Sequence, residues 1–223
     1  NFKNFMNFFL KKSFFDMSVN SSKILQEKVI FIGDSGVGKT SIVSRRSGGS
    51  IDQEGSPTIC SEQTIIKEEY DNRKLDLIVW DTAGQERYKS LSVIFIRFSK
   101  AVIIVFSAND RSTFNSVDDW YDKAQSVLYN ENPYYILVEN KCDLYDENDK
   151  NSVSFEEGKN KADSLGIDFL YTSAFDGINI NELFQNIAAN YISSLKTQKS
   201  SIETHDLDLE KDTLQNETKS SCC

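Results

Sequence analysis

Short apolar runs alternate with longer amphipathic segments along most of this chain. The apolar runs predict six strands, at residues 28–33, 63–70, 74–81, 101–108, 134–141 and 167–174. Apolar residues at helical spacing predict helices at residues 39–47, 112–129, 153–166 and 179–196. Because strands and helices alternate, the chain is expected to adopt an α/β fold with a mostly parallel sheet and helices on both faces.

One connection departs from this alternation. The polar segment DNRK, residues 71–74, joins the second and third predicted strands directly, and Asp and Asn favour a tight reversal. These two strands are expected to pair as a hairpin, which gives a six-stranded sheet with one antiparallel strand. Such sheets bind ligands beyond the carboxyl ends of their strands, where Gly33, Asp81, Asn140 and Ser173 lie.

The regular pattern covers residues 24–196, which are expected to form one domain. Residues 1–16 mix Phe with Asn and Lys and lack the apolar segment and cleavage site of a signal peptide, so we expect residues 1–23 to be an extension without its own fold. The tail, residues 197–223, is charged and polar and is expected to be disordered. No apolar run reaches the roughly 18 residues that a membrane-spanning helix needs.

Charge and cysteine content narrow the function classes. The chain has 25 Lys and Arg against 34 Asp and Glu, a formal charge of −9, which opposes binding to nucleic acid. Of its four cysteines, Cys222 and Cys223 end the chain while Cys60 and Cys142 lie far apart. A reduced intracellular protein is therefore expected rather than a disulfide scaffold.

The segment GDSGVGKT, from Gly33 to Thr40, has the spacing of a phosphate-binding loop and lies between a predicted strand and a predicted helix. Its glycines allow backbone N–H groups to surround phosphate oxygens, and Lys39 is expected to reach the β- and γ-phosphates. Thr40 is expected to ligate Mg²⁺. The alternative is a glycine-rich turn that caps a helix, with Lys39 solvated. The candidate phosphate contacts in this segment are Asp34, Ser35, Gly36, Val37, Gly38, Lys39, Thr40 and Ser41.

The segment NKCD, residues 140–143, follows the strand at 134–141. With the phosphate loop, it resembles the Ras superfamily of small GTPases, in which this motif reads guanine. Asp143 can accept two hydrogen bonds from guanine that adenine cannot supply. The resemblance places Lys141 along the base plane and Asn140 as a brace for the loop. By itself, NKCD also suits an ordinary turn after a strand.

The segment TSA, residues 172–174, matches the second base-contacting loop of that family. The resemblance implies that the N–H of Ala174 meets the guanine carbonyl oxygen, with Ser173 and Phe175 beside it. Phe175 stands where the family usually has Lys, and Ile51 stands where the family usually stacks an aromatic residue.

The segment WDTAGQERY, residues 80–88, resembles the region of the family that senses the γ-phosphate. The resemblance implies that Asp81 holds Mg²⁺ through water, that Gly84 bonds the γ-phosphate, and that Gln85 orients the attacking water. Thr58 lies at the spacing of the other sensor, with its hydroxyl on Mg²⁺ and its N–H on the γ-phosphate. A P-loop GTPase fold that switches between GTP and GDP states is therefore expected.

No arginine is evidently placed to supply charge in the transition state. Arg45, Arg46 and Arg87 are near enough in sequence to be considered, but solvated surface roles are expected for all three. Hydrolysis is therefore expected to be slow and to depend on an activating protein.

Within the superfamily the resemblance is closest to Rab proteins, over residues 24–196 and the tail. Cys222-Cys223 resembles the ending on which Rab proteins carry two geranylgeranyl groups, and two chains give a stable membrane anchor. The resemblance implies a monomer on the cytoplasmic face of intracellular membranes that cycles with the cytosol. Its partners would be an exchange factor, a GTPase-activating protein, a dissociation inhibitor or escort protein, and GTP-dependent effectors of vesicle trafficking. Residues 59–64 (ICSEQT) depart from the Rab pattern.

Three hypotheses follow. The first is a Rab-like GTPase that cycles and recruits effectors when GTP is bound. The second is a binding module of the same fold that acts as a scaffold with little or no cycling, which the departures at Ile51, Phe175 and after Thr58 motivate. The third is a P-loop nucleotide kinase or ATPase, against which NKCD and the paired cysteines stand.

Overall fold

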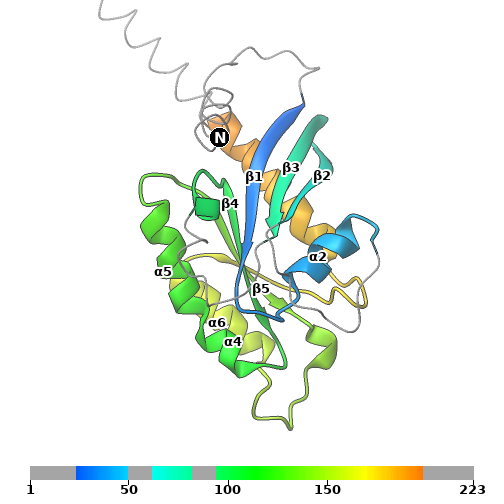
Figure 1. Ribbon diagram of the computed structural model, residues 1–223, viewed down its shortest axis with the longest axis vertical. Helices are drawn as coiled ribbons and strands as arrows, with labels where there is room; N and C mark the ends of the chain where they lie inside the picture. The colour runs from blue at the N-terminus through cyan, green and yellow to red at the C-terminus, as the bar shows by residue number, and fades with distance from the viewer. Residues whose placement is uncertain (1–23, 50–61, 82–93, 198–223) are drawn as a thin grey trace, which may run out of the picture.

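The computed structural model describes residues 24–49, 62–81 and 94–197. They form a six-stranded sheet in the order β2-β3-β1-β4-β5-β6 (Figure 1). Its strands are β1 (Leu25–Ile32), β2 (Glu62–Tyr70), β3 (Arg73–Asp81), β4 (Ala101–Ser107), β5 (Tyr134–Asn140) and β6 (Asp168–Tyr171). β2 pairs antiparallel with β3, and the other neighbours pair in parallel. The predicted mostly parallel sheet with one antiparallel strand is confirmed.

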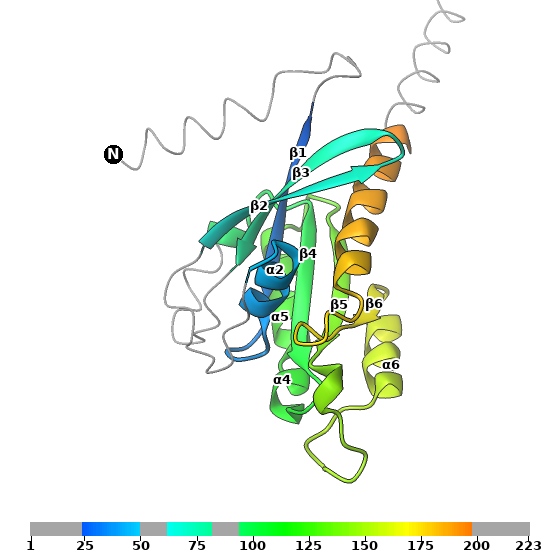
Figure 2. The ribbon, with the colours of Figure 1, turned by 90° about the vertical axis from the view of Figure 1, so that its right-hand side faces the viewer.

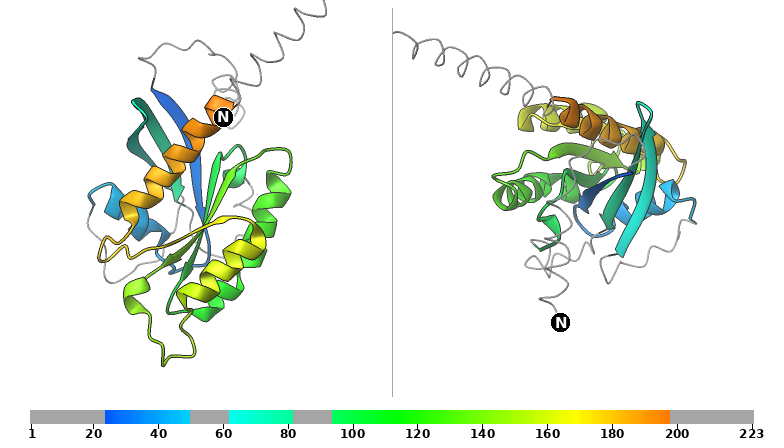
Figure 3. Two further views of the ribbon diagram at one scale, coloured as in Figure 1. Left: turned by 180° about the vertical axis from the view of Figure 1, so that it is seen from behind. Right: turned by 90° about the horizontal axis from the view of Figure 1, so that it is seen from above.

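Helices cover both faces of this sheet, as predicted. They are α2 (Lys39–Arg46), α4 (Arg111–Asn115), α5 (Val117–Val127), α6 (Phe155–Leu165), the short 3₁₀ helix η2 (Cys142–Leu144) and a C-terminal helix over residues 180–197. One apolar cluster includes side chains of α2 and the C-terminal helix. The other includes side chains of α5 and α6. Alternate residues of β1 and β4 belong to opposite clusters, as the side chains of a doubly covered sheet must. Figure 3 shows these layers from behind and from above.

The β2–β3 hairpin closes with a two-residue turn. Asp71 and Asn72 both have positive φ, 52° and 58°, and Tyr70 pairs with Arg73 across the turn. Asn and Asp tolerate this left-handed conformation better than most residues. The hairpin extends beside the C-terminal helix, shown in orange in Figure 2, where Lys196 pairs with Asp71 at 2.6 Å.

The element boundaries differ from the predicted ones by a few residues, and two of the differences have a visible local cause. The helix predicted at 112–129 is divided at Ser116 into α4 and α5, and the Ser116 hydroxyl donates to the Ser112 carbonyl at 3.2 Å. β6 ends at Tyr171 rather than at residue 174, because Ser173 leaves the sheet and pairs instead with Ile178 in an isolated bridge. No helix in the described ranges is long and apolar enough to cross a membrane.

Candidate nucleotide-binding site

The loop after β1 depends on glycine for both its conformation and its close contacts. Gly33, Gly36 and Gly38 have φ of 140°, 79° and 93°, which side chains rarely adopt. A Cβ on Gly33 would lie 2.2 Å from the Val105 carbonyl oxygen, and one on Gly38 would lie 2.3 Å from the Asn140 amide nitrogen. The backbone of the loop is therefore packed directly against β4 and β5.

The start of α2 favours an anion. Gly38 caps the helix without a side-chain hydrogen bond, and the first turn contains no acidic residue, so its N–H groups and helix dipole favour a phosphate. Lys39 is only 5% exposed, and its ammonium donates to the carbonyls of Gly33 and Asp34 at 2.8 and 2.7 Å. The alternative in which Lys39 is solvated is wrong, because the side chain is buried along the loop.

Two oxygen donors meet at the end of the loop. The Thr40 hydroxyl, from α2, donates to the Asp81 carboxylate, at the end of β3, at 2.5 Å across 41 positions of sequence. Asp81 is 3% exposed. A hydroxyl and a carboxylate side by side are the hard donors that Mg²⁺ takes, usually alongside waters and substrate phosphates. This donor set therefore fits the predicted metal.

Asn140 connects the phosphate loop to the base-contacting segments. It is 1% exposed, and its amide nitrogen donates to the Val37 carbonyl at 2.8 Å across 103 positions. Its amide oxygen accepts hydrogen bonds from the Thr172 hydroxyl at 3.1 Å and from the Ala174 N–H at 3.3 Å. One side chain thus holds together the loop after β1, the end of β5 and the segment after β6.

The remaining base-motif residues surround this connection. Lys141 adopts the left-handed conformation, with φ 61°, and its side chain passes over Gly38. Asp143 is exposed on η2, where its carboxylate is accessible to a ligand. The Ala174 N–H, expected to meet a guanine carbonyl, donates to Asn140 in this structure. Ser173 is fully buried, whereas Phe175 is 57% exposed.

A polar cleft of about 500 Å³ lies beside these motifs. Ser35 and Gly36 of the phosphate loop and Lys141 of the base motif line it. Asp110 and Asp149 line it as well. The phosphate and base motifs therefore border one hollow, of a size that suits a small-molecule ligand.

Of the two arginines at the end of α2, one differs from the sequence prediction. Arg46 is not a solvated surface residue, because it donates from both Nε and Nη2 to Glu68 Oε1, at 2.9 and 2.5 Å, and Glu68 is 8% exposed. The prediction of a solvated role for Arg46 is therefore wrong. Arg45 is exposed, as expected.

Glu139, the residue before Asn140, was not anticipated as unusual. It is 3% exposed, and among the described residues its Oε2 has no hydrogen-bond partner. Burial, and then the negative charge of Glu157, raise the pKa of Glu139 to about 7. Gly158 of α6 leaves room for this carboxyl, since a Cβ there would lie 3.0 Å from Glu139 Oε2. The only sequence signals are a Glu in an apolar strand and a Gly inside a helix.

A second contact that sequence reasoning missed reaches the phosphate loop from α5. The Trp120 indole Nε1 donates to the Asp34 carboxylate at 2.8 Å, across 86 positions. A tryptophan in an amphipathic helix is usually a core residue, so the sequence did not indicate this hydrogen bond.

Other predicted residues lie outside the described ranges: Ile51, Thr58, Gly84, Gln85, Arg87, Cys222 and Cys223.

Comparison with known proteins agrees with this geometry. The family model described as "Ras family" matches residues 28–193. The chain is 36% identical over 161 residues to the GTP-binding protein ypt2 of Schizosaccharomyces pombe, which covers 72% of this chain and 78% of the relative. It is 36% identical over 171 residues to the Ras-related protein RIC1 of Oryza sativa subsp. japonica, covering 77% of this chain and 83% of the relative.

The matched region includes the phosphate loop, the Thr40–Asp81 pair and the Asn140 connection. The P-loop kinase hypothesis is wrong, since the family model spans all of these elements. The chain belongs to the Ras family, as a small GTPase of the Rab type.

Proposed function

We propose that this GTPase is a GTP/GDP-controlled switch that recruits effectors of vesicle trafficking to intracellular membranes. The observation that carries the proposal is the Asn140 side chain, which joins the phosphate loop at Val37 to the base-contacting segment at Thr172 and Ala174. A site built this way reads the phosphates and the base of one nucleotide together. Both relatives carry names, GTP-binding and Ras-related, that support the same reading.

In this proposal, each described residue has a defined role toward the nucleotide. The loop N–H groups and Lys39 bind the β- and γ-phosphates. Thr40 would hold Mg²⁺ directly and Asp81 would hold it through water, and the ion would offset charge on the phosphate oxygens. Asp143 accepts hydrogen bonds from the guanine edge, while Asn140 and Lys141 hold the base loop beside the phosphate loop.

The switch itself depends on residues outside the described ranges. We assign Gln85 to orient the attacking water, and Thr58 and Gly84 to sense the γ-phosphate. Loss of that phosphate releases their segments, so partners distinguish the two states by differential affinity. An exchange factor, an activating protein and an escort protein complete the cycle. Two prenyl groups on Cys222 and Cys223 anchor the chain to the cytoplasmic face of membranes.

The scaffold without a cycle is not favoured. It depended on Ile51, Phe175 and the segment after Thr58, whereas the Mg²⁺ donor pair and the buried Lys39 are present in the described structure. Phe175 is an uncharged side chain that is 57% exposed.

The test is a titration of the full chain with fluorescent GDP, GTP and ATP, with and without Mg²⁺, followed by single-turnover hydrolysis of GTP. We expect tight, Mg²⁺-dependent binding of guanine nucleotides over ATP, and slow hydrolysis that is abolished in Gln85→Leu. Unselective binding, or hydrolysis that Gln85→Leu leaves unchanged, contradicts the proposal.

A further inference from the structure

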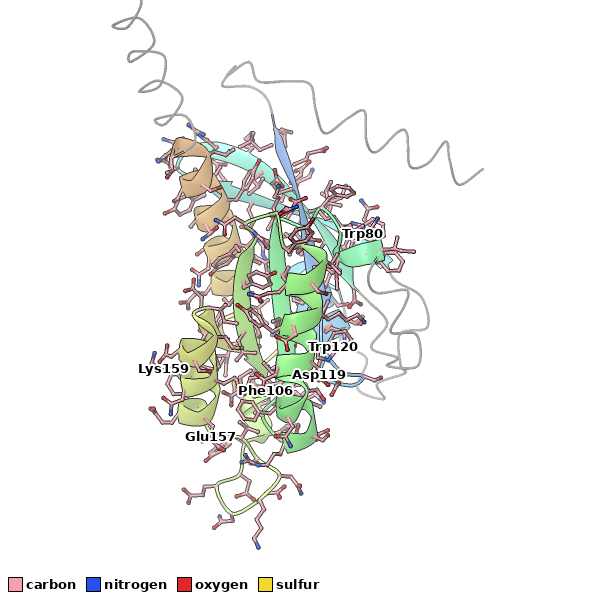
Figure 4. The ribbon with its side chains drawn as sticks, turned by 90° about the vertical axis from the view of Figure 1, so that its left-hand side faces the viewer. Trp80, Phe106, Asp119, Trp120, Glu157 and Lys159 are labelled. Carbon is pink, nitrogen blue, oxygen red and sulfur yellow. The ribbon has the colours of Figure 1, made fainter. Side chains whose placement is uncertain are left out.

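Trp120 links α5 to the phosphate loop through a single hydrogen bond. Its indole N–H donates to Asp34 Oδ1 at 2.8 Å, and Asp34 is the second residue of the loop, directly after Gly33. Figure 4 labels Trp120 on α5, with its side chain directed toward the pale blue segment that contains the loop. The phosphate loop is thus held from outside the nucleotide motifs.

The indole is fixed in place by its own surroundings. The half-buried ring packs against the apolar cluster that α5 shares with the sheet, and the Lys123 ammonium lies 5.2 Å from its centroid. The main-chain N–H of Trp120 donates to the Ser116 carbonyl at 3.1 Å, at the start of α5. An indole N–H can only donate, and the Asp34 carboxylate is the acceptor that it contacts in this structure.

Asp34 connects this bond to the lysine of the loop. Its side chain accepts from Trp120, while its main-chain carbonyl accepts from the Lys39 ammonium at 2.7 Å. Fixing the side chain of Asp34 restricts the backbone torsions of the same residue. That restriction fixes the carbonyl that holds Lys39 beside the position of the phosphates.

The charge of Asp34 gives the bond a second consequence. A carboxylate in a loop that binds a polyanion repels the ligand and attracts the neighbouring ammonium. The hydrogen bond from the indole N–H directs the Asp34 carboxylate toward α5. Charged acceptors make the stronger hydrogen bonds, so the orientation is well held.

From these contacts we infer that Trp120 is a positioning residue for nucleotide binding, which acts through Asp34 on Lys39. The inference rests on the proposed function, since it assumes that the loop binds the phosphates of a guanine nucleotide. It predicts that removing only the indole N–H loosens the nucleotide without unfolding the domain.

The test compares Trp120→Phe with the wild-type full chain, each loaded with fluorescent GDP or a non-hydrolysable GTP analogue. Phe retains an aromatic ring at this position and removes the donor. We expect nucleotide to dissociate about 10- to 100-fold faster, as loss of one hydrogen bond to a charged group implies. The increase should be larger for the GTP analogue, because Lys39 reaches its additional phosphate.

The matched control is Tyr121→Phe, the next residue of α5. Its hydroxyl donates to the Leu165 carbonyl at 3.3 Å, on α6 and away from the loop. We expect this variant to release nucleotide at the wild-type rate even where its melting temperature falls. Equal acceleration in both variants would mean that α5 acts only through stability, and would overturn the inference.

A double-mutant cycle with Asp34→Ala isolates the bond. If Trp120 acts through the Asp34 carboxylate, Trp120→Phe has no further effect on release in the Asp34→Ala background. A full effect in that background, or wild-type release by Trp120→Phe alone, overturns the inference and leaves the proposed function intact. A wild-type chain that binds no guanine nucleotide overturns both.

Discussion

Replacing Glu139 by Gln should stabilise this protein at about pH 8 and leave its stability at about pH 4 almost unchanged. The Glu139 carboxyl is 3% exposed and its Oε2 lacks a hydrogen-bond partner among the described residues. Gln has nearly the same shape and hydrogen-bonding groups as a protonated Glu, but it cannot ionise. The exchange therefore removes one event, the loss of a proton inside the fold, and keeps the packing against Gly158.

The magnitude follows from the difference between the pKa values in the two states. The pKa of Glu139 is raised from 4.5 to about 7, by burial first and by the charge of Glu157 second. Each pKa unit corresponds to about 1.4 kcal/mol, so the ionised carboxylate destabilises the fold by about 3 kcal/mol. This is a large part of the stability of an ordinary domain.

The direction of the pH dependence is set by proton binding. Below pH 4.5 both states hold the proton and the penalty is absent. Between pH 4.5 and about 7 the unfolded chain has lost the proton that the folded chain retains, so the free energy of unfolding falls as pH rises. Above that window the carboxyl is ionised in both states and the penalty is complete.

The assay is urea unfolding of the wild type and Glu139→Gln across this pH range, at equal nucleotide and Mg²⁺ concentrations. Taking the difference between the two proteins cancels the titration of every other group. The difference should rise from near zero at about pH 4 to about 3 kcal/mol at about pH 8. Glu182→Gln, an exposed change on the C-terminal helix, controls for the loss of one negative charge.

A difference that stays constant over the whole range would refute the reasoning. It would mean that Glu139 is already ionised in the fold at low pH, which requires a partner or a hydrated carboxylate that the described burial excludes.

Three further changes test the site and its surroundings. Gly38→Ala places a Cβ 2.3 Å from the Asn140 amide nitrogen, at a φ of 93°. Nucleotide affinity measured by titration should therefore fall by at least about 100-fold, and binding near the wild-type value would contradict the close packing. Asp143→Asn should weaken GDP binding by about 100-fold or more and favour xanthosine diphosphate, whose additional carbonyl can accept from the new amide, in a competition assay. Arg46→Met removes the cation that pairs with Glu68, a carboxylate that is 8% exposed. The free energy of unfolding, measured by urea denaturation, should fall by about 3 kcal/mol, and an unchanged value would show that the pair contributes nothing.

Much of the fold was predictable because its signals are local. The apolar runs that became β1, β4 and β5 are bounded by polar or glycine-rich segments, and the Asp71-Asn72 turn determines the hairpin by its two positive φ values. The phosphate loop was predictable for the same reason, since its spacing and its place between a strand and a helix lie within one short segment.

The missed features all depend on residues that meet across the fold. Arg46 and Glu68 lie 22 positions apart, and Trp120 and Asp34 lie 86 apart, so neither pair has a local pattern. Glu139 lies near the end of an apolar run, and nothing in that run shows that α6 packs over this carboxyl. Whether a polar side chain is buried depends on which helix packs over it. The hydrophobic periodicity of the sequence indicates only that one face of a strand or helix is buried.

The Asn140 amide has a consequence for folding. The segments that it joins are separated by 103 and 34 positions, and contacts between such distant segments form late because closing long loops costs entropy. Until β1, β5 and the segment after β6 have docked, the two halves of the nucleotide site remain apart. A chain emerging from the ribosome therefore acquires affinity for nucleotide only when almost the whole domain is in place. Nucleotide then stabilises the completed fold alone, in proportion to the logarithm of its concentration over the dissociation constant, and its retention reports the quality of folding.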